Sequence, residues 1–223
     1  MLIELIHSYR EREKACKHVM KKQTMITFNM RKELINWLFE LLDVFVLEKM
    51  EMNSILYQAV MILDRYCEKV VIQRKEYQII GAICLGLAMK YESSFSLAFD
   101  DILYYCDTKD YTKNDLSEYE MRILKALDFN ISFVNSYMVM TSLILCDGDV
   151  KEEKMKYAMD MLKTCLLDER LMTHKPSLVA STVVYLSNIH FGEKKVWGKT
   201  LKDLTRYRAN RFDTVKSILV IEI

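Results

Sequence analysis

The stretch IIGAICLGLAMKYE, residues 79–92, constrains the fold more than any other part of this sequence. Its apolar run, residues 79–89, has no polar side, so a helix formed here must be buried all round. The run is too short to cross a bilayer, which needs about 20 apolar residues. Small residues, including Gly81 and Gly86, would let neighbouring helices approach closely. The stretch therefore predicts the central helix of a helical domain rather than a strand.

A lysine, Lys90, follows this run and has two interpretations. Either its ammonium group extends to water, or carboxylates and carbonyls hold it at an interface. Three further charged residues lie beside apolar helical stretches: Arg31, Asp64 and Glu120. Two charges of each sign favour pairing, because removing one partner of a buried ion pair costs about 3–5 kcal/mol. The alternative, in which all four side chains reach solvent, stays open from these residues alone.

Composition narrows the class of protein. The 223 residues include one proline and five glycines, and 51% are hydrophobic. Few turns are available, so we expect a nearly all-helical protein with a sizeable core. The 32 basic and 31 acidic residues give a formal net charge of +1. This balance provides no overall field to attract nucleic acid or an anionic membrane, and we expect neither as a partner.

Residues that could perform chemistry or bind a metal are scattered. The six cysteines form no C-x-x-C pair and the four histidines are isolated, so no metal site is predicted. The sequence contains no phosphate-binding glycine loop, nucleophile elbow or zinc-protease motif. We expect a protein that is not an enzyme and has no cofactor. The apparent absence of a signal peptide predicts a reducing intracellular compartment.

Helical periodicity divides the chain into one N-terminal helix and two sets of five helices. The N-terminal helix is expected over residues 2–19. The two sets are expected at residues 30–48, 54–68, 75–92, 99–106 and 113–127, then at 136–146, 151–167, 177–190, 200–207 and 209–219. Residues 128–135 break the period and are predicted to link the sets. Each set has its most apolar helix third, which indicates a duplicated unit.

Five spaced blocks carry a resemblance to a known family: MRKELINWLFEL, ILDRY, QIIGAICLGLAMKYE, DYTK and EMRILKALDFNI. With IHSYREREKACK before them and HKPSLVAS after them, they resemble cyclins, most closely the A- and B-type mitotic cyclins. The resemblance implies an all-α protein with two tandem five-helix cyclin folds preceded by an N-terminal helix. The implied domains are residues 1–27 for the N-terminal helix and linker, 28–131 for the N-terminal cyclin box and 132–223 for the C-terminal cyclin fold.

The resemblance also implies a function. Such a protein binds and activates a cyclin-dependent protein kinase and helps recruit its substrates in cell-cycle control, in the nucleus and cytoplasm. Arg31 and Asp64 correspond to a buried pair that joins the first two helices of the box. The implied kinase-binding residues are Lys90, Glu120, Leu87, Tyr91, Phe129, Ile131 and Ile79, together with Ile6, Tyr9 and Arg10 of the N-terminal helix.

A second implied surface captures Arg-x-Leu motifs in substrates or inhibitors. Its matching residues are Met30, Leu34, Trp37, Glu40 and Gln78. A plain core role for Leu34 and Trp37 is the alternative, because tryptophan is commonly mostly buried. The chain departs from the family pattern at Glu33, Asn36, Tyr77 and Ser93. Glu33 stands where the family has an apolar residue, and these departures bear on the implied docking preference more than on the implied kinase binding.

Two other classes of function stay open. One is a cyclin-fold transcription adaptor that grips DNA or a peptide motif, and salt-sensitive duplex binding would favour it. The other is an unrelated helical scaffold. The chain starts almost at the folded region, without the tail that carries degradation signals in mitotic cyclins. The expectation is therefore either a trimmed chain or a compact, viral-type cyclin.

Overall fold

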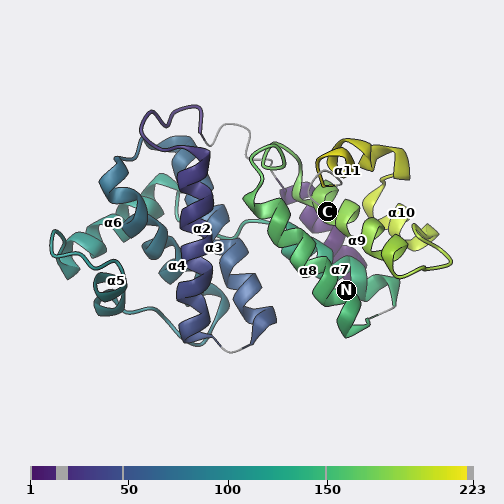
Figure 1. The fold of residues 1–223 in the computed structure, drawn as a ribbon, viewed down its shortest axis with the longest axis horizontal. Helices are drawn as coiled ribbons and strands as arrows, with labels where there is room; N and C mark the ends of the chain where they lie inside the picture. Colours follow the sequence, from purple (N-terminus) through teal and green to yellow (C-terminus); the bar gives the residue numbers. More distant parts are fainter. Residues whose placement is uncertain (1, 14–19, 47, 149, 220–223) are drawn as a thin grey trace. The chain divides into compact units, whose positions relative to one another are not determined.

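The structure is a computed structural model that describes residues 2–13, 20–46, 48–148 and 150–219. These residues form helices, turns and loops, and no β-strand occurs among them (Figure 1). The α-helices are α1 Leu2–Arg12, α2 Phe28–Phe45, α3 Lys49–Lys69, α4 Tyr77–Glu92, α5 Phe99–Tyr105, α6 Lys113–Ala126, α7 Ser136–Asp147, α8 Glu152–Leu167, α9 Pro176–His190, α10 Lys199–Thr205 and α11 Asp213–Leu219. Two 3-10 helices are η1 Arg74–Glu76 and η2 Ala209–Phe212.

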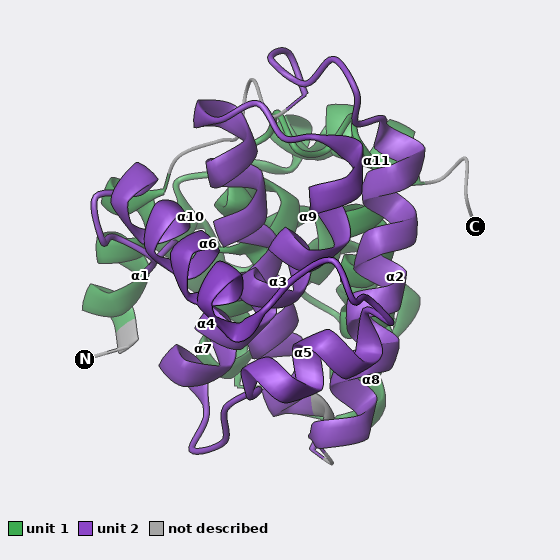
Figure 2. Cartoon of the chain, turned by 90° about the vertical axis from the view of Figure 1, so that its left-hand side faces the viewer, with its two compact units in different colours: residues 1–17, 134–223 green, residues 18–133 purple. Residues whose placement is uncertain are grey.

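The chain divides into two compact units, coloured separately in Figure 2. Unit 2 is His18–Phe133 and contains α2 to α6. Unit 1 is Met1–Lys17 with Val134–Ile223, and it contains α7 to α11 together with α1. The two predicted sets of five helices are therefore confirmed. The N-terminal helix groups with the second set. The predicted domains, with boundaries at residues 27 and 131, had treated this helix as a separate segment.

Helix α4 is the centre of unit 2, as its apolar run predicts. Every residue from 79 to 89 is buried, and α4 packs against α2, α3, α5 and α6. A Cβ atom on Gly81 would lie 2.8 Å from Leu34 Cδ2, so the missing side chain lets α2 approach α4 closely. A Cβ atom on Gly86 would meet only ordinary contacts, at 3.8 Å. A glycine is thus needed at position 81 but not at position 86.

Side-chain caps define two of the helix starts in unit 2. Thr27 Oγ1 accepts a hydrogen bond from Met30 N at 3.2 Å and begins α2. Thr112 and Asp115 form the predicted capping box at α6, each side chain accepting from the other residue's backbone N–H. Helix α3 begins at Lys49, so the predicted start after Asn53 is wrong. Buried Met52 explains the extra turn, because it contributes to the core one turn earlier.

Helix α9 is the most enclosed helix of unit 1, and it packs against α7 and α8. Pro176 occupies its first position, where the missing N–H costs no hydrogen bond. Helix α1 packs against α7 and α10 in the same unit. Just after α1, the Glu13 carboxylate accepts hydrogen bonds from Ser177 N at 2.9 Å and Ser177 Oγ at 2.8 Å. Glu13 thereby caps α9; the predicted continuation over residues 14–19 lies outside the described residues.

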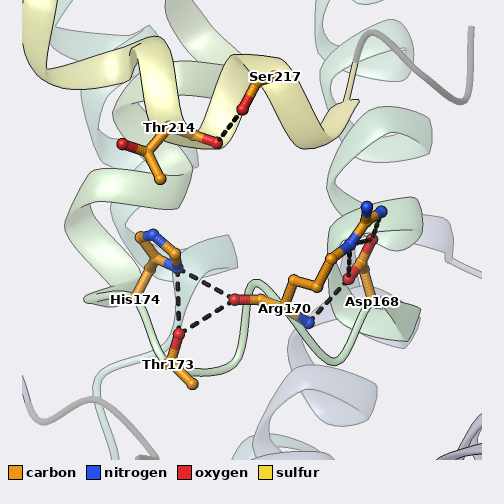
Figure 3. A network of polar contacts seen from close by, with 6 residues as sticks. All are labelled: Asp168, Arg170, Thr173, His174, Thr214 and Ser217. Carbon is orange, nitrogen blue, oxygen red and sulfur yellow. Dashed lines mark hydrogen bonds and ion pairs between the residues drawn. The ribbon is translucent and has the colours of Figure 1, made fainter.

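The turn between α8 and α9 is held by its own polar groups (Figure 3). Asp168 accepts from Arg170 N at 2.8 Å and pairs with the Arg170 guanidinium at 2.5 Å. Thr173 Oγ1 donates to Arg170 O at 3.1 Å, and His174 Nδ1 lies 3.2 Å from the same oxygen. These contacts fix the chain direction before Pro176, and they give His174 a role in the turn.

The cysteines that the structure describes are free thiols. Cys67, Cys84 and Cys165 are buried, whereas Cys106 and Cys146 are partly exposed. Burial raises the pKa of the Cys84 thiol, so it stays protonated and packs as a small apolar group. Among the described residues, no cluster of His, Cys, Asp and Glu could hold a metal ion. None of the described helices is sufficiently long and apolar to cross a bilayer.

Candidate functional site

A buried ion pair joins α2 to α3. Arg31 Nε donates to Asp64 Oδ1 at 2.9 Å, and Arg31 Nη2 donates to Asp64 Oδ2 at 2.7 Å. The two side chains are only 2% and 5% exposed. This two-pronged geometry offsets the cost of burying both charges. The pair fixes α2 relative to α3 and is too deeply buried to contact a partner itself.

A second ion pair, between Lys90 and Glu120, lies at the surface of unit 2. Lys90 Nζ is 2.7 Å from Glu120 Oε1 and 2.9 Å from Oε2, joining the end of α4 to α6. Lys90 keeps 45% of its side chain exposed and Glu120 keeps 18%. The Lys90 ammonium also lies 5.6 Å from the centroid of the Phe99 ring. Lys90 thus reaches the surface and is held there by a carboxylate and an aromatic ring.

Exposed aromatic side chains also occur at the end of α4 and after α6. Tyr91 is 52% exposed, and its hydroxyl donates to Ser132 Oγ at 2.9 Å. Phe129 is 62% exposed, and it follows Asp128 in the left-handed region, with φ values of 57° and 54°. Such backbone is uncommon for residues other than glycine and concentrates at functional sites. This backbone ends α6 and leaves a large apolar ring in solvent.

The other predicted kinase-binding residues occupy different environments. Leu87 and Ile79 are 4% and 2% exposed, so they support the surface from the core of unit 2. Ile131 is half-buried, and its carbonyl oxygen accepts a hydrogen bond from Gln58 Nε2. Ile6 and Tyr9 belong to unit 1 and are buried, with 0% and 7% exposure. Arg10, on the same helix, has its guanidinium carbon 5.5 Å from the centre of the Tyr207 ring.

A groove of about 270 Å³ opens between α2 and the start of α4. The residues that line it are Met30, Glu33, Leu34, Trp37, Arg74, Tyr77 and Gln78. Four of the five predicted docking residues are among them, and the fifth, Glu40, is exposed outside the groove. Burial raises the pKa of the Tyr77 hydroxyl, which therefore stays neutral. Leu34 fits both a core role and a docking role, because it is only 6% exposed and also lines the groove.

Arg74 is a groove residue that the sequence patterns missed. It begins η1, a short 3-10 turn in front of α4. Its spacing could have indicated this position. Arg74 precedes Gln78 by four residues, so the two side chains can lie on the same side of a continuing helix. The groove therefore combines an apolar wall with one carboxylate, Glu33, and one guanidinium.

Two family models match the chain. The model of the cyclin N-terminal domain matches residues 4–132, and that of the cyclin C-terminal domain matches residues 126–220. The chain belongs to the cyclin family. Its two sets of five helices are accordingly tandem cyclin folds. The Lys90–Glu120 pair and the groove both lie in unit 2, within the residues matched by the N-terminal domain.

Similar proteins include mitotic cyclins. The chain is 32% identical over 207 residues to cyclin-B2-1 of Oryza sativa subsp. japonica, covering 92% of this chain and 48% of that protein. It is 29% identical over 221 residues to the G2/mitotic-specific cyclin-A of Drosophila melanogaster, covering 96% and 43%. The chain thus spans about half the length of these relatives. A viral cyclin from herpesvirus saimiri superposes with a TM-score of 0.80 at 20% identity, covering 99% of this chain and 97% of the other.

Proposed function

We propose that this chain is a regulatory subunit that binds and activates a cyclin-dependent protein kinase in cell-cycle control. The single observation that carries the proposal is the exposed Lys90–Glu120 pair, which lies in the cyclin N-terminal domain with Tyr91 beside it in sequence. Large aromatic side chains are common contributors to binding energy in protein interfaces, and charged groups fix the register of the two partners. Membership of the cyclin family and similarity to mitotic cyclins support the same function.

In this proposal the chain acts by holding a kinase in its active arrangement. The surface around Lys90, Glu120 and Phe129 would contact the mobile helix of the kinase and keep it turned inward. The lysine–glutamate pair of the kinase would then form, and its activation loop would open. All chemistry would belong to the kinase, and the complex would act in the nucleus and cytoplasm.

Direct binding tests this proposal. The purified chain is immobilised, and a panel of purified cyclin-dependent kinases is passed over it in an interferometry experiment. We expect at least one kinase to bind with a dissociation constant below about 1 μM, equivalent to about −8 kcal/mol. A panel in which every kinase fails to bind, while a DNA duplex binds, would support the adaptor alternative instead.

We also propose that the groove between α2 and α4 recruits substrates that carry an Arg-x-Leu motif. Its apolar wall of Met30, Leu34 and Trp37 offers a place for the leucine side chain. Its carboxylate, Glu33, is exposed and offers a partner for a basic residue. Recruitment would be separate from kinase activation, because the groove residues differ from the residues of the Lys90–Glu120 surface.

Replacing Trp37 by alanine should reduce binding of an Arg-x-Leu peptide by about tenfold or more, since it removes the largest side chain from the apolar wall of the groove. Kinase activation without a docking peptide should stay unchanged. Fluorescence anisotropy with a labelled peptide measures the first quantity, and a kinase assay measures the second. Phe28→Ala is the matched control, because Phe28 is also a partly exposed aromatic residue of α2 but does not line the groove. Equal loss of both activities in Trp37→Ala would indicate a structural role for this tryptophan.

Glu33 should alter which Arg-x-Leu peptides bind. We expect the chain to prefer a peptide with lysine next to the leucine over one with phenylalanine there, by about fivefold, because Glu33 can pair with the lysine. Glu33→Leu should reverse this order. Asp43→Leu, which removes an exposed carboxylate elsewhere on α2, should leave the order unchanged. A preference that stays the same in Glu33→Leu would exclude this role.

A further inference from the structure

The near-neutral net charge conceals a strongly basic segment in unit 1. Residues 194–211 contain seven basic residues and one acidic residue. The basic residues are Lys194, Lys195, Lys199, Lys202, Arg206, Arg208 and Arg211, and all seven are exposed. Within the part of the chain that the structure describes, none of them forms an ion pair. We call these seven residues the basic face. Their charges are free for an anionic partner.

The backbone that carries the basic face is held in place by aromatic residues. Trp197, Tyr207 and Phe212 pack around one another, with ring centroids 4.9 Å apart for Trp197 and Phe212 and 6.4 Å apart for Tyr207 and Phe212. Trp197 Nε1 also donates to Tyr207 O at 3.0 Å. Arg206, Arg208 and Arg211 lie between Trp197 and Phe212 along the chain, and their side chains are exposed. The arginines therefore project from ordered backbone, which lowers the entropic cost of binding.

Arg206 occupies a backbone conformation that favours glycine. It ends α10 with φ 55°, in the left-handed region. Two other helices of unit 1 are followed by glycine in this conformation: Gly148 after α7, with φ 81°, and Gly192 after α9, with φ 64°. An arginine at such a position costs stability that a glycine would not. Strain of this kind points to a use for the side chain, here its exposed guanidinium.

A further cation lies beside the same segment. The guanidinium carbon of Arg10, on α1, is 5.5 Å from the centre of the Tyr207 ring. Tyr207 stands between Arg206 and Arg208 in the sequence. Arg10 Nε is buried and has no hydrogen-bond partner among the described residues. Arg10 is therefore a further cation close to the segment that carries Arg206 and Arg208.

We propose that the basic face binds an acidic segment of a partner protein. Large exposed apolar side chains are absent from the described residues 190–219, which argues against insertion into a bilayer and against stacking of unpaired bases. A long DNA duplex would extend beyond the basic face onto a chain whose net charge is only +1. A short stretch of glutamate or aspartate residues requires no such extended surface. The proposal concerns unit 1 and does not depend on the Lys90–Glu120 surface of unit 2.

Fluorescence anisotropy tests the proposal with the full chain. The probe is a labelled peptide of alternating glutamate and glycine, compared with the same peptide carrying glutamine and with a DNA duplex. The triple variant Arg206→Gln, Arg208→Gln, Arg211→Gln removes three charges of the basic face. Its matched control, Lys21→Gln, Lys22→Gln, Lys156→Gln, removes three exposed charges elsewhere. Arg206→Gly removes one charge and also relieves the strain of a non-glycine residue in the left-handed backbone conformation.

We expect the glutamate peptide to bind, with an affinity that falls as salt rises, and the glutamine peptide not to bind. The triple variant should bind the glutamate peptide about tenfold more weakly, while the control triple should bind like the original chain. Arg206→Gly should raise Tm and still weaken binding, which a merely structural role for Arg206 would not produce. Equal losses in both triple variants would overturn the proposal, and so would tighter binding of the duplex than of the glutamate peptide.

Discussion

Replacing Asp64 by alanine should lower the free energy of unfolding by about 3–5 kcal/mol, the largest stability effect that we expect in this chain. The variant leaves the Arg31 guanidinium, which is 2% exposed, buried without the carboxylate that now pairs with it. The pair also joins α2 to α3, so its loss affects the helices that position the groove and α4. Urea unfolding followed by circular dichroism measures the change as a shift of the midpoint at constant slope.

Two further variants separate the buried charge from other effects. Asp100→Ala breaks an exposed pair of similar length, Asp100 with Lys113 at 2.7 Å, and should cost less than about 1 kcal/mol. The double variant Arg31→Met, Asp64→Leu removes both buried charges and should recover much of the loss. A loss in Asp64→Ala no larger than that in Asp100→Ala would contradict the assignment of Arg31–Asp64 as the ion pair that stabilises unit 2.

Replacing both Lys90 and Glu120 by alanine should weaken kinase binding by about thirtyfold or more, because truncating charged groups that become buried at an interface costs about 2–5 kcal/mol. The folded chain should lose little stability, since Lys90 keeps 45% of its side chain exposed. Interferometry against the bound kinase and urea unfolding of the free chain measure the two quantities. The expected result is a large loss of affinity with an almost unchanged unfolding midpoint.

The matched control for this variant is Lys113→Ala with Asp100→Ala. That pair also joins a lysine to a carboxylate at 2.7 Å on the surface of unit 2, between α5 and α6. It should leave the kinase affinity within about threefold of the original, because exposed pairs contribute little. Unchanged kinase affinity in the Lys90 and Glu120 variant, with binding of the original chain intact, would place the kinase-binding surface elsewhere.

Much of the fold could be predicted because it follows from local patterns. The apolar run at 79–89 has only one stable placement, at the centre of a helical unit, and α4 occupies it. Thr112 and Asp115 mark the start of α6 through hydrogen bonds between near neighbours. The start of α3 was missed because burial of Met52 in the core stabilises the first turn, and no capping side chain marks it in the sequence. Likewise, the Glu13–Ser177 contact joins residues far apart in the sequence.

The candidate site could be predicted in part. The resemblance to cyclins supplied the residue types at Lys90 and Glu120, and their separation of 2.7 Å became visible only once α4 and α6 were packed together. The resemblance could not show that Leu87 and Ile79 are buried beneath the surface. The basic face was hidden because total charge averages over the whole chain, whereas binding depends on which charges remain exposed and unpaired.

Phosphorylation of histone tests the central proposal most directly. A cyclin-dependent kinase is assayed alone, with the original chain, and with the chain carrying Lys90→Ala and Glu120→Ala. The proposal predicts strong stimulation by the original chain and, at an equal subsaturating concentration, much weaker stimulation by the variant. Histone phosphorylation that stays at the level of the kinase alone, for every kinase of the panel, would contradict the proposal that this cyclin activates a cyclin-dependent kinase.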